Sequence, residues 1–489
     1  MGRYETVIGL EIHVELQTAS KLFCGCSARF GSEPNTNCCP VCLGLPGSLP
    51  VFNRRAIELA VTAALALNSE VQDKSRFDRK NYFYPDLPKA YQVSQYDQPL
   101  AKGGFLEFRD ENKSRLVNLE RVHLEEEAGK LIHAGESILD AEYSLVDYNR
   151  AGIPLLEIVT KPDLRSGSEA RLFLENLRLL LLYAGISDCK MEEGSLRCDA
   201  NISLRLTGSQ ELGTKAEVKN MNSFKAVEAA LNYEAVRQEK ILNAGGKVDQ
   251  ETCHWNEETK ETIPLRGKEG SSDYRYFPEP DLLPLVIDKS LINKLTALLP
   301  ESPLQRYQRL QEQYGLAESE VQLFIENREL GDYFESAAKK YSNYHNLANW
   351  VQGDLLFQLR ECGCRLDQLL PDHLVEILDL LDSGEINRPV AKELLAESLR
   401  AGSSPRDLVA KKNLGRIADR DQLLPLVNQV IAENPEAVEN FMLGKDKAIA
   451  FLVGKVMALS GGRADPGELN QLFRELLKKK NGCEANGTS

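Results

Sequence analysis

The spacing of hydrophobic residues along the chain changes near residue 290. Before that point, short runs alternate between apolar and polar positions, as in YETVIGLEIHVEL at residues 4–16. Two segments, residues 54–67 and 168–185, have helical spacing instead. From about Ile292 onward, the helical spacing continues almost throughout. Alternation with period two is typical of strands and a 3.6-residue period is typical of helices, so we predict an α+β domain followed by helices.

A second boundary falls at the Gly-Ser-Ser-Pro segment 402–405, ahead of a smaller helical unit. Within this unit, Asp465 precedes Pro466, and Glu468 follows two residues later. Asp at the N-cap, Pro at the first helical position and Glu in the first turn are typical of a helix start, so we predict a helix from Pro466. The predicted domains are residues 1–292, 293–408 and 409–489.

The composition is that of a soluble globular protein, with 42% hydrophobic and 27% charged residues. Apolar stretches such as residues 179–184 fall far short of the roughly 20 residues that a membrane-spanning helix requires. The first residues lack the basic and apolar regions of a signal peptide. We therefore expect a cytoplasmic protein that does not span a membrane.

Charge is distributed unevenly along the chain. The net charge of −14 argues against a protein coated in nucleic acid but permits a local basic patch. Residues 409–489 contain twelve basic and ten acidic residues. The basic residues of this tail include Lys411, Lys412, Arg416, Arg420, Lys445, Lys447, Lys455 and Arg463. They either lie on solvated helix faces or form a surface that contacts phosphates.

The first predicted strand places ionisable residues on one face. Because strand side chains alternate, the apolar residues from Ile8 to Leu16 share a face, and Glu11, His13 and Glu15 share the other. Carboxylates with few nitrogen ligands suit Mg²⁺ or Mn²⁺ better than zinc. The strand therefore predicts either the floor of a divalent-metal site or a polar side that faces solvent.

Further ionisable residues lie within apolar surroundings. RVHLEEE contains Glu125 and Glu126, PLLEIVT contains Glu157, and MEEGSLRCDANISL contains Asp199 and Asn201. A triplet of acids is usually a solvated charge run, but a charge within a strand rich in Val, Leu and Ile seldom lacks a partner. If several of these acids converge on one sheet, they form a site for a metal and a phosphoryl group.

Basic residues that could complement these acids occur among aromatic residues. FDRKNYFYPDLPKAYQ contains Lys80 and Lys89, KAEVKNMNSFK contains Lys219, and SSDYRYFPEPD contains Arg275. Such mixtures can stack a nucleobase and pair with phosphates. The alternative is a core edge with lysines whose stems pack on apolar surface.

Four of the eleven cysteines are spaced as two close pairs, and a fifth, Cys38, is adjacent to the second pair. The paired residues are Cys24, Cys26, Cys39 and Cys42. Four thiolates in two pairs can surround Zn²⁺ tetrahedrally, and the alternative is free buried thiols. Without an export signal, metal binding is a better interpretation than disulfides.

The chain contains no P-loop, no Rossmann glycine motif after a strand, no G-x-S-x-G elbow and no H-E-x-x-H motif. Any nucleotide binding is therefore of another kind. The residues alone indicate an α+β enzyme with a Mg²⁺–carboxylate site and a helical, locally basic C-terminal part.

Six segments together resemble the B subunits of the bacterial-type aspartyl/glutamyl-tRNA(Asn/Gln) amidotransferases. They are ETVIGLEIHVEL, FDRKNYFYPDLPKAYQ, RVHLEEEAGK, SLVDYNRAGIPLLEIV, MEEGSLRCDANISLR and DYRYFPEPDL. The strings are long and specific, and the likeness extends from Tyr4 to the last helix. The resemblance implies a large mixed-sheet cradle domain with a zinc-binding insertion near residues 24–42, a helical domain, and a small helical tail domain that contacts tRNA.

The resemblance also implies a reaction and partners. ATP would phosphorylate the side-chain carboxylate of mischarged Glu-tRNA(Gln) or Asp-tRNA(Asn), and ammonia would displace the phosphate to form the amide. The amidase (A) subunit would release the ammonia from glutamine, and the small connector (C) subunit would complete a heterotrimer. The implied ligands are Mg²⁺, ATP as a substrate and structural Zn²⁺.

Carried over onto this chain, the resemblance implies a metal and phosphate site of six residues: Glu11, His13, Glu125, Glu126, Glu157 and Asp199. Glu11, His13 and Glu126 are expected to hold Mg²⁺, and the other three are expected around it or at the ammonia exit. Residues expected at ATP phosphates or the tRNA acceptor end are Lys80, Lys89, Asn201, Lys219 and Arg275. Family members that retain the four cysteines bind zinc through Cys24, Cys26, Cys39 and Cys42.

Two other functions remain open at this point. The first is a non-catalytic, zinc-stabilised scaffold that presents tRNA to other subunits, and replacement of Glu11 or His13 would leave its function intact. The second is a carboxylate–amine ligase that acts alone on a small molecule. Such a ligase would not need the basic tail at residues 409–489.

Overall fold

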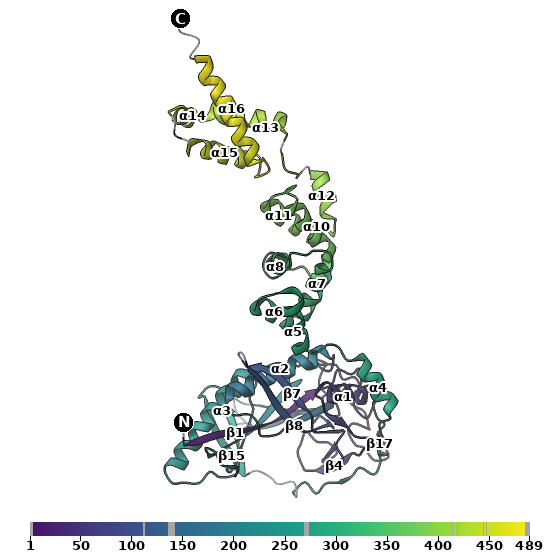
Figure 1. Cartoon of the computed structure of the whole chain (residues 1–489). Coiled ribbons are helices and arrows are strands. Elements are labelled where there is room, and N and C mark those ends of the chain that lie inside the picture. Colours follow the sequence, from purple (N-terminus) through teal and green to yellow (C-terminus); the bar gives the residue numbers. More distant parts are fainter. Residues whose placement is uncertain are drawn as a thin grey trace. The chain divides into compact units, whose positions relative to one another are not determined.

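The computed structural model divides the chain into two compact units, Met1–Arg306 and Tyr307–Ser489 (Figure 1). The described residues are 3–110, 113–134, 142–267, 273–412, 414–417, 419–443, 445 and 447–484. The first unit combines a large mixed sheet with helices, and the second is built from helices. The predicted α+β class is confirmed, and the division into domains 1–292, 293–408 and 409–489 stays a prediction.

The first unit is organised around a 13-stranded sheet. Its five central strands, in spatial order, are β13 (Ala216–Lys219), β12 (Leu196–Leu206), β1 (Tyr4–Glu15), β11 (Pro154–Thr160) and β8 (Lys113–Glu126). Each of these neighbouring pairs is antiparallel. Beyond β13, the sheet continues through the parallel strand β14 (Glu251–Asn256) to β15 (Glu261–Gly267). Beyond β8, it continues through β5 (Tyr91–Ser94), β4 (Asp78–Asn81) and β16 (Phe277–Pro278).

Shorter strands complete this sheet and form two small ones. The strands that join the large sheet beside β8 are β2 (Glu70–Val71), β6 (Ala101–Lys102) and β7 (Phe105–Asp110). The two small sheets pair β9 (Lys130–His133) with β10 (Ser144–Asp147), and β3 (Lys74–Ser75) with β17 (Leu285–Val286). The segment 144–160, which has strand-like composition, thus splits into β10 and β11, with a turn at Gly152 (φ +86°) between them.

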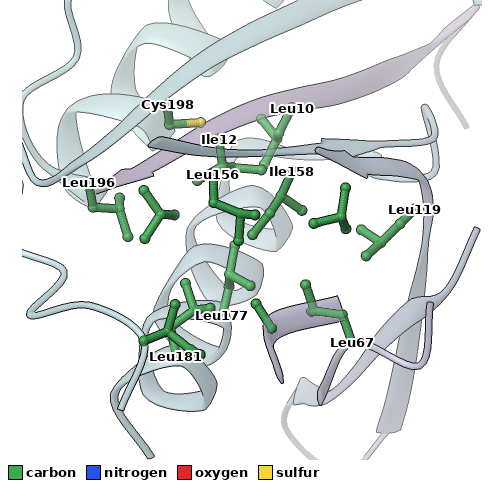
Figure 2. Close-up of a cluster of buried hydrophobic side chains, with 14 of the residues drawn as sticks. Leu10, Ile12, Leu67, Leu119, Leu156, Ile158, Leu177, Leu181, Leu196 and Cys198 are labelled. Carbon is green, nitrogen blue, oxygen red and sulfur yellow. The ribbon is translucent and has the colours of Figure 1, made fainter. Parts of the chain in front are cut away.

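One face of the central strands forms the hydrophobic core. Ile8, Leu10 and Ile12 of β1 have no exposed surface, as their alternation predicts. This core includes side chains of α1 (Arg54–Ala66), α2 (Gly167–Tyr183) and α3 (Phe224–Asn243), and Leu295 of the later helix α4 (Lys289–Leu298). Figure 2 shows Leu177 and Leu181 of α2 beneath the side chains of the central strands. Full burial of each such side chain stabilises the fold by about 1.5–3 kcal/mol.

Polar residues mark where these helices begin. The Ser166 side chain accepts a hydrogen bond from the backbone N–H of Glu169, whose carboxylate accepts one from the N–H of Arg165. Ser223 caps α3 in the same way through Ala226. These bonds satisfy N–H groups that have no partner within the helix. The helices therefore start where their caps place them, over the core face of the sheet.

Helices continue through the rest of the chain. In the first unit, α4 (Lys289–Leu298) follows the sheet, and α5 (Pro303–Tyr314) spans the boundary between the units. The second unit continues with α6 (Glu318–Glu326), α7 (Arg328–Ala338), α8 (Tyr344–Asn349), the π-helical turn η1 (Trp350–Leu355), α9 (Leu356–Cys362), the 3₁₀ turn η2 (Leu366–Gln368), α10 (Pro371–Asp382) and α11 (Arg388–Ala401). It ends with α12 (Pro405–Lys412), α13 (Arg420–Glu433), α14 (Pro435–Met442), α15 (Lys447–Leu459) and α16 (Pro466–Glu484).

The last helix starts at the predicted residue. The Asp465 carboxylate accepts hydrogen bonds from the backbone N–H groups of Gly467 and Glu468, and α16 begins at Pro466. The predicted start is therefore confirmed. Over the portions of the chain that the structure describes, no helix has the length and apolar character needed to cross a membrane.

Candidate active site

The face of the sheet opposite the core carries ionisable side chains in register. His13 of β1 lies opposite Glu157 of β11, and Glu157 lies opposite His123 of β8. Two residues earlier on β1, Glu11 lies opposite Asp199 of β12. Residues directly opposite each other in antiparallel strands have Cβ atoms about 5 Å apart. The register alone therefore brings these groups together, although they come from distant parts of the sequence.

His13, Glu125 and Glu157 form a compact cluster. His13 Nε2 lies 3.5 Å from Glu125 Oε1 and 3.9 Å from Glu157 Oε2. One potential ligand atom from each residue lies within 4.8 Å of the other two. The side chain of Glu125 is 4% exposed and that of His13 is 21% exposed. Glu125 is therefore the buried member of the cluster, and His13 is accessible to solvent.

Glu157 is held in its ionised form. His123 Nε2 lies 2.9 Å from Glu157 Oε2. Burial disfavours the carboxylate anion, but the charges of His123, His13 and Lys80 outweigh burial and hold the pKa of Glu157 well below its ordinary range. At neutral pH, Glu157 is therefore an anion that accepts hydrogen bonds or binds a cation.

The donor set of this cluster fits a hard divalent cation. It offers one imidazole nitrogen and two carboxylates, and Mg²⁺ and Mn²⁺ prefer such oxygen-rich sites. The sequence-based prediction placed Glu11 and Glu126 beside His13 as the metal ligands. In the structure, the carboxylates of Glu11 and Glu126 have other partners, described next. The assignment of ligands to a metal stays a prediction.

A second group of carboxylates lies on the same face, beside the His13 cluster. Asn201 Nδ2 donates a hydrogen bond to Glu11 Oε1 at 2.9 Å. The Lys219 ammonium pairs with Asp199 and lies 3.5 Å from Glu217 Oε1. The predicted residues Glu11, Asp199, Asn201 and Lys219 are thus brought together. Within this group, Asn201 and Lys219 donate hydrogen bonds to the acids.

Glu126 faces a different environment. Its carboxylate pairs with the Lys89 ammonium and accepts a hydrogen bond from the backbone N–H of Val93 at 2.9 Å. Both groups line a cavity of about 200 Å³, which Cys42 and Glu279 also line. The Glu126 side chain is buried, with 4% of its surface exposed. Glu126 and Lys89 therefore form a neutralised pair beside the cysteines and outside the His13 cluster.

Lys80 and Arg275 lie on the segments β4 and 273–278, which run side by side. Lys80 Nζ lies 5.6 Å from the ring centroid of Tyr82 and 4.9 Å from that of Tyr274, within cation–π distance. Arg275 adopts a left-handed backbone conformation (φ +46°), and its carbonyl accepts a hydrogen bond from Asn81 Nδ2 at 2.9 Å. The charge of Lys80 also contributes to lowering the pKa of Glu157, whereas the Arg275 side chain is exposed.

The four predicted cysteines come together. Potential ligand sulfurs of Cys24, Cys26, Cys39 and Cys42 lie within 4.8 Å of one another, so this group could hold a metal ion. A hydrogen bond from Cys24 holds the pKa of the Cys42 thiol well below its ordinary value, and the nearby Lys21 adds to this effect. The adjacent Cys38 lies outside the group, with its sulfur 4.0 Å from Asn149 Oδ1.

Basic residues of the C-terminal tail differ in their partners. Lys412, Arg416 and Arg420 form ion pairs with acidic residues of the same unit. Lys447 and Lys455 have no acidic partner among the residues that the structure describes. A part of the predicted basic surface is therefore neutralised internally, and another part is available to an anionic partner.

Sequence reasoning missed two buried basic residues of this region. His123 was not selected, although it lies two residues before Glu125 on β8 and so shares its face. That alternation is the signal that could have found it. Lys21 is completely buried and donates a hydrogen bond to the carbonyl of Tyr148 at 3.2 Å. An isolated lysine in an irregular segment gives no comparable signal.

Comparisons with known proteins agree with this architecture. Residues 6–293 match the model of the GatB/GatE catalytic domain, and residues 332–477 match that of the GatB domain. The chain is 51% identical over 481 residues to the aspartyl/glutamyl-tRNA(Asn/Gln) amidotransferase B subunit of Carboxydothermus hydrogenoformans, and the match covers 98% of this chain and all of the relative. The proteins of the same name from Moorella thermoacetica and Persephonella marina are 50% and 46% identical, over 97% of this chain and all of each relative.

These similarities extend over both units of the chain, and they include the strands that carry His13, Glu125 and Glu157. The chain therefore belongs to the family of aspartyl/glutamyl-tRNA(Asn/Gln) amidotransferase B subunits.

Proposed function

We propose that this chain catalyses the ATP-dependent conversion of mischarged Glu-tRNA(Gln), Asp-tRNA(Asn) or both to the amidated aminoacyl-tRNA. In the first step, a side-chain carboxylate oxygen attacks the γ-phosphorus of ATP, which yields an acyl phosphate and ADP. In the second step, ammonia attacks the acyl carbon, the bond from carbon to the bridging oxygen breaks, and inorganic phosphate leaves with the proton that the nitrogen loses. The relatives' names state that they are subunits of such amidotransferases acting with these tRNAs.

The observation that carries this proposal is the cluster of His13, Glu125 and Glu157 on the polar face of the sheet. These residues would hold Mg²⁺, which neutralises phosphate charge during phosphoryl transfer when it is bound. Glu157, kept anionic by its neighbours, and the buried Glu125 supply negative charge at fixed positions. A fixed charge costs little reorganisation during the reaction.

The surrounding residues have proposed roles in substrate binding. Lys80 lies beside the cluster and can approach a phosphate, and Lys219 and Asn201 can do so from the neighbouring strands. Arg275 has an exposed side chain at the rim, which suits the acceptor end of the tRNA. Lys89, which pairs with Glu126 at the cavity, is a weaker candidate for phosphate contact, because its charge is already neutralised.

We further propose that the chain works with two partner proteins. The amidase (A) subunit would supply ammonia from glutamine, and the connector (C) subunit would complete a heterotrimer. Lys447 and Lys455 of the tail would contact tRNA phosphates, because they have no acidic partner among the described residues. The cysteine group would hold a structural Zn²⁺, whose tetrahedral geometry four thiolates satisfy.

Oxygen-isotope transfer tests the proposed chemistry directly. Glu-tRNA(Gln) labelled with ¹⁸O in the side-chain carboxylate is incubated with the three-subunit complex, Mg·ATP and ammonium chloride. Formation of an acyl phosphate predicts that one ¹⁸O per amide formed appears in inorganic phosphate. Amide formation without label in phosphate would contradict the acyl-phosphate route.

A further inference from the structure

His123 forms the buried end of a row of side chains that leads to His13. Its Nε2 lies 2.9 Å from Glu157 Oε2, and the same oxygen lies 3.9 Å from His13 Nε2. The three residues come from the neighbouring strands β8, β11 and β1, and each lies directly opposite the next in register. The row is therefore part of the rigid centre of the sheet rather than of a loop.

Exposure decreases steadily along this row. The side chain of His13 is 21% exposed, that of Glu157 is 13% exposed and that of His123 is 3% exposed. A substrate or a metal ion arriving from solvent meets His13 and Glu157, whereas His123 lies behind them. His123 therefore acts on the site through Glu157.

Only one of the two ring nitrogens of His123 has a hydrogen-bond partner among the described residues. His123 Nε2 lies within hydrogen-bond distance of Glu157 Oε2, and because a carboxylate oxygen accepts, His123 Nε2–H is the donor. The other ring nitrogen, Nδ1, is buried and has no hydrogen-bond partner among the described residues. A buried polar atom without a partner costs about 1–3 kcal/mol. A hydrophobic side chain would avoid that cost, so packing alone does not account for a histidine at this position.

Taking the proposed function as given, we infer that His123 is a positioning residue, which fixes the Glu157 carboxylate so that Glu157 and His13 bind one divalent cation together. Partners that orient a metal-binding group typically contribute about 10- to 100-fold to metal affinity. Without the Nε2–H donor, the carboxylate is free to rotate towards its other cationic neighbours. One such neighbour is Lys80, which already acts on Glu157 electrostatically.

Manganese binding to the zinc-loaded three-subunit complex tests this inference. Free Mn²⁺ is measured by electron paramagnetic resonance for the wild type, His123→Leu and His123→Gln. The Nε2 of Gln can occupy the position of the imidazole Nε2 and donate the same hydrogen bond. We expect His123→Leu to weaken Mn²⁺ binding at least about 10-fold and His123→Gln to remain within about threefold of the wild type.

His133→Leu is the matched control, because His133 is a half-buried histidine of β9, which pairs with β10 and lies in a separate small sheet. It should bind Mn²⁺ as the wild type does. If His123→Leu does not fold, His123→Asn is measured instead. The Asn side chain is too short to place its amide where the imidazole Nε2 lies, so it cannot donate the hydrogen bond to Glu157. We expect His123→Asn to weaken binding as well.

Wild-type affinity in His123→Leu or His123→Asn would overturn the inference, and so would equal weakening in a folded His123→Gln. The magnesium concentration that gives half-maximal amide formation should shift in the same order as Mn²⁺ affinity. If the wild-type complex bound no Mn²⁺, both the metal site of the proposed function and the inference about His123 would be wrong. A wild-type site that survives His123→Leu would overturn only the role of His123.

Discussion

The two faces of the central sheet come from the same strands but are stabilised in different ways. Leu156 has no exposed surface and packs in the core, whereas the next residue, Glu157, lies among two histidines on the other face. The core face gains stability from burial of apolar surface against helices. The polar face concentrates charges whose burial is costly unless they are paired. The charged groups thus take their positions from strands that the opposite face stabilises.

Irregular segments line the cavity that contains Glu126 and Lys89. The insertion at residues 24–42 holds the four cysteines together. The segment after β16 is fixed by two hydrogen bonds of 2.7 Å from Arg79 to the buried Glu279. The ring of Tyr91 lies 4.2 Å from the Arg79 guanidinium carbon. The cysteine group and the Arg79–Glu279 pair therefore hold these irregular segments in place.

Loss of the cysteine group should have the largest effect on stability. Structural zinc sites contribute directly to folding, so we expect Cys39→Ser to lower the zinc content and the melting temperature. The corresponding loss in unfolding free energy should be several kcal/mol. Cys38→Ser is the matched control, since Cys38 lies outside the group. It should change the zinc content and the melting temperature only slightly. Zinc well below one per chain in the wild type, with no loss of stability in Cys39→Ser, would contradict the zinc assignment.

Removal of the Arg79 side chain should have the next largest effect. Arg79→Ala leaves the Glu279 carboxylate, which is 1% exposed, buried without its partner. We expect a loss of about 3–5 kcal/mol in the unfolding free energy measured by denaturant titration. Arg54→Ala removes an 81%-exposed arginine from a surface pair and should cost less than about 1 kcal/mol. Equal effects of the two changes would show that the segment after β16 does not depend on this pair.

Neighbouring substitutions on β11 compare the two faces directly. Leu156→Ala removes a core side chain and should cost about 2–5 kcal/mol of stability. Glu157→Gln should fold with a smaller change in stability but lose amide formation with ammonium by about 100-fold or more, because it removes charge from the cluster. Full activity in Glu157→Gln would show that amide formation does not depend on the charge of the polar face.

The alternation within each strand could be read from the sequence, but the pairing between strands could not. Residues 4–16 predicted the two faces of β1, and the structure confirms them. That His13 would lie opposite Glu157 depends on long-range register, which adjacent residues do not specify. By contrast, alternation along β8 places His123 and Glu125 on one face and Glu126 on the other, so these two features were within reach of the sequence but were not predicted. Helical segments such as residues 54–67 were predicted well, because their pattern is local.

Changes in the tail should have the smallest individual effects. Replacement of Lys447 and Lys455 by Gln should lower the slope of tRNA affinity against salt concentration by about one for each phosphate that the tail no longer neutralises. Arg420→Gln is the control, because Arg420 pairs with Glu468 at 3.1 Å, and it should leave the slope unchanged. Filter binding at several salt concentrations measures the slope. An unchanged slope in the double variant would place the tRNA-binding surface elsewhere.

The central claim is that the polar face of the sheet, and not another protein of the complex, forms the amide. The most direct test uses the three-subunit complex with Mg·ATP, Glu-tRNA(Gln) and ammonium chloride in place of glutamine, which bypasses the amidase. Formation of Gln-tRNA(Gln) is compared for the wild type, His13→Ala and the control His133→Ala. We predict robust product from the wild type and the control, and almost none from folded His13→Ala. Equal product from all three would mean that the His13 cluster is structural and that the active site lies elsewhere.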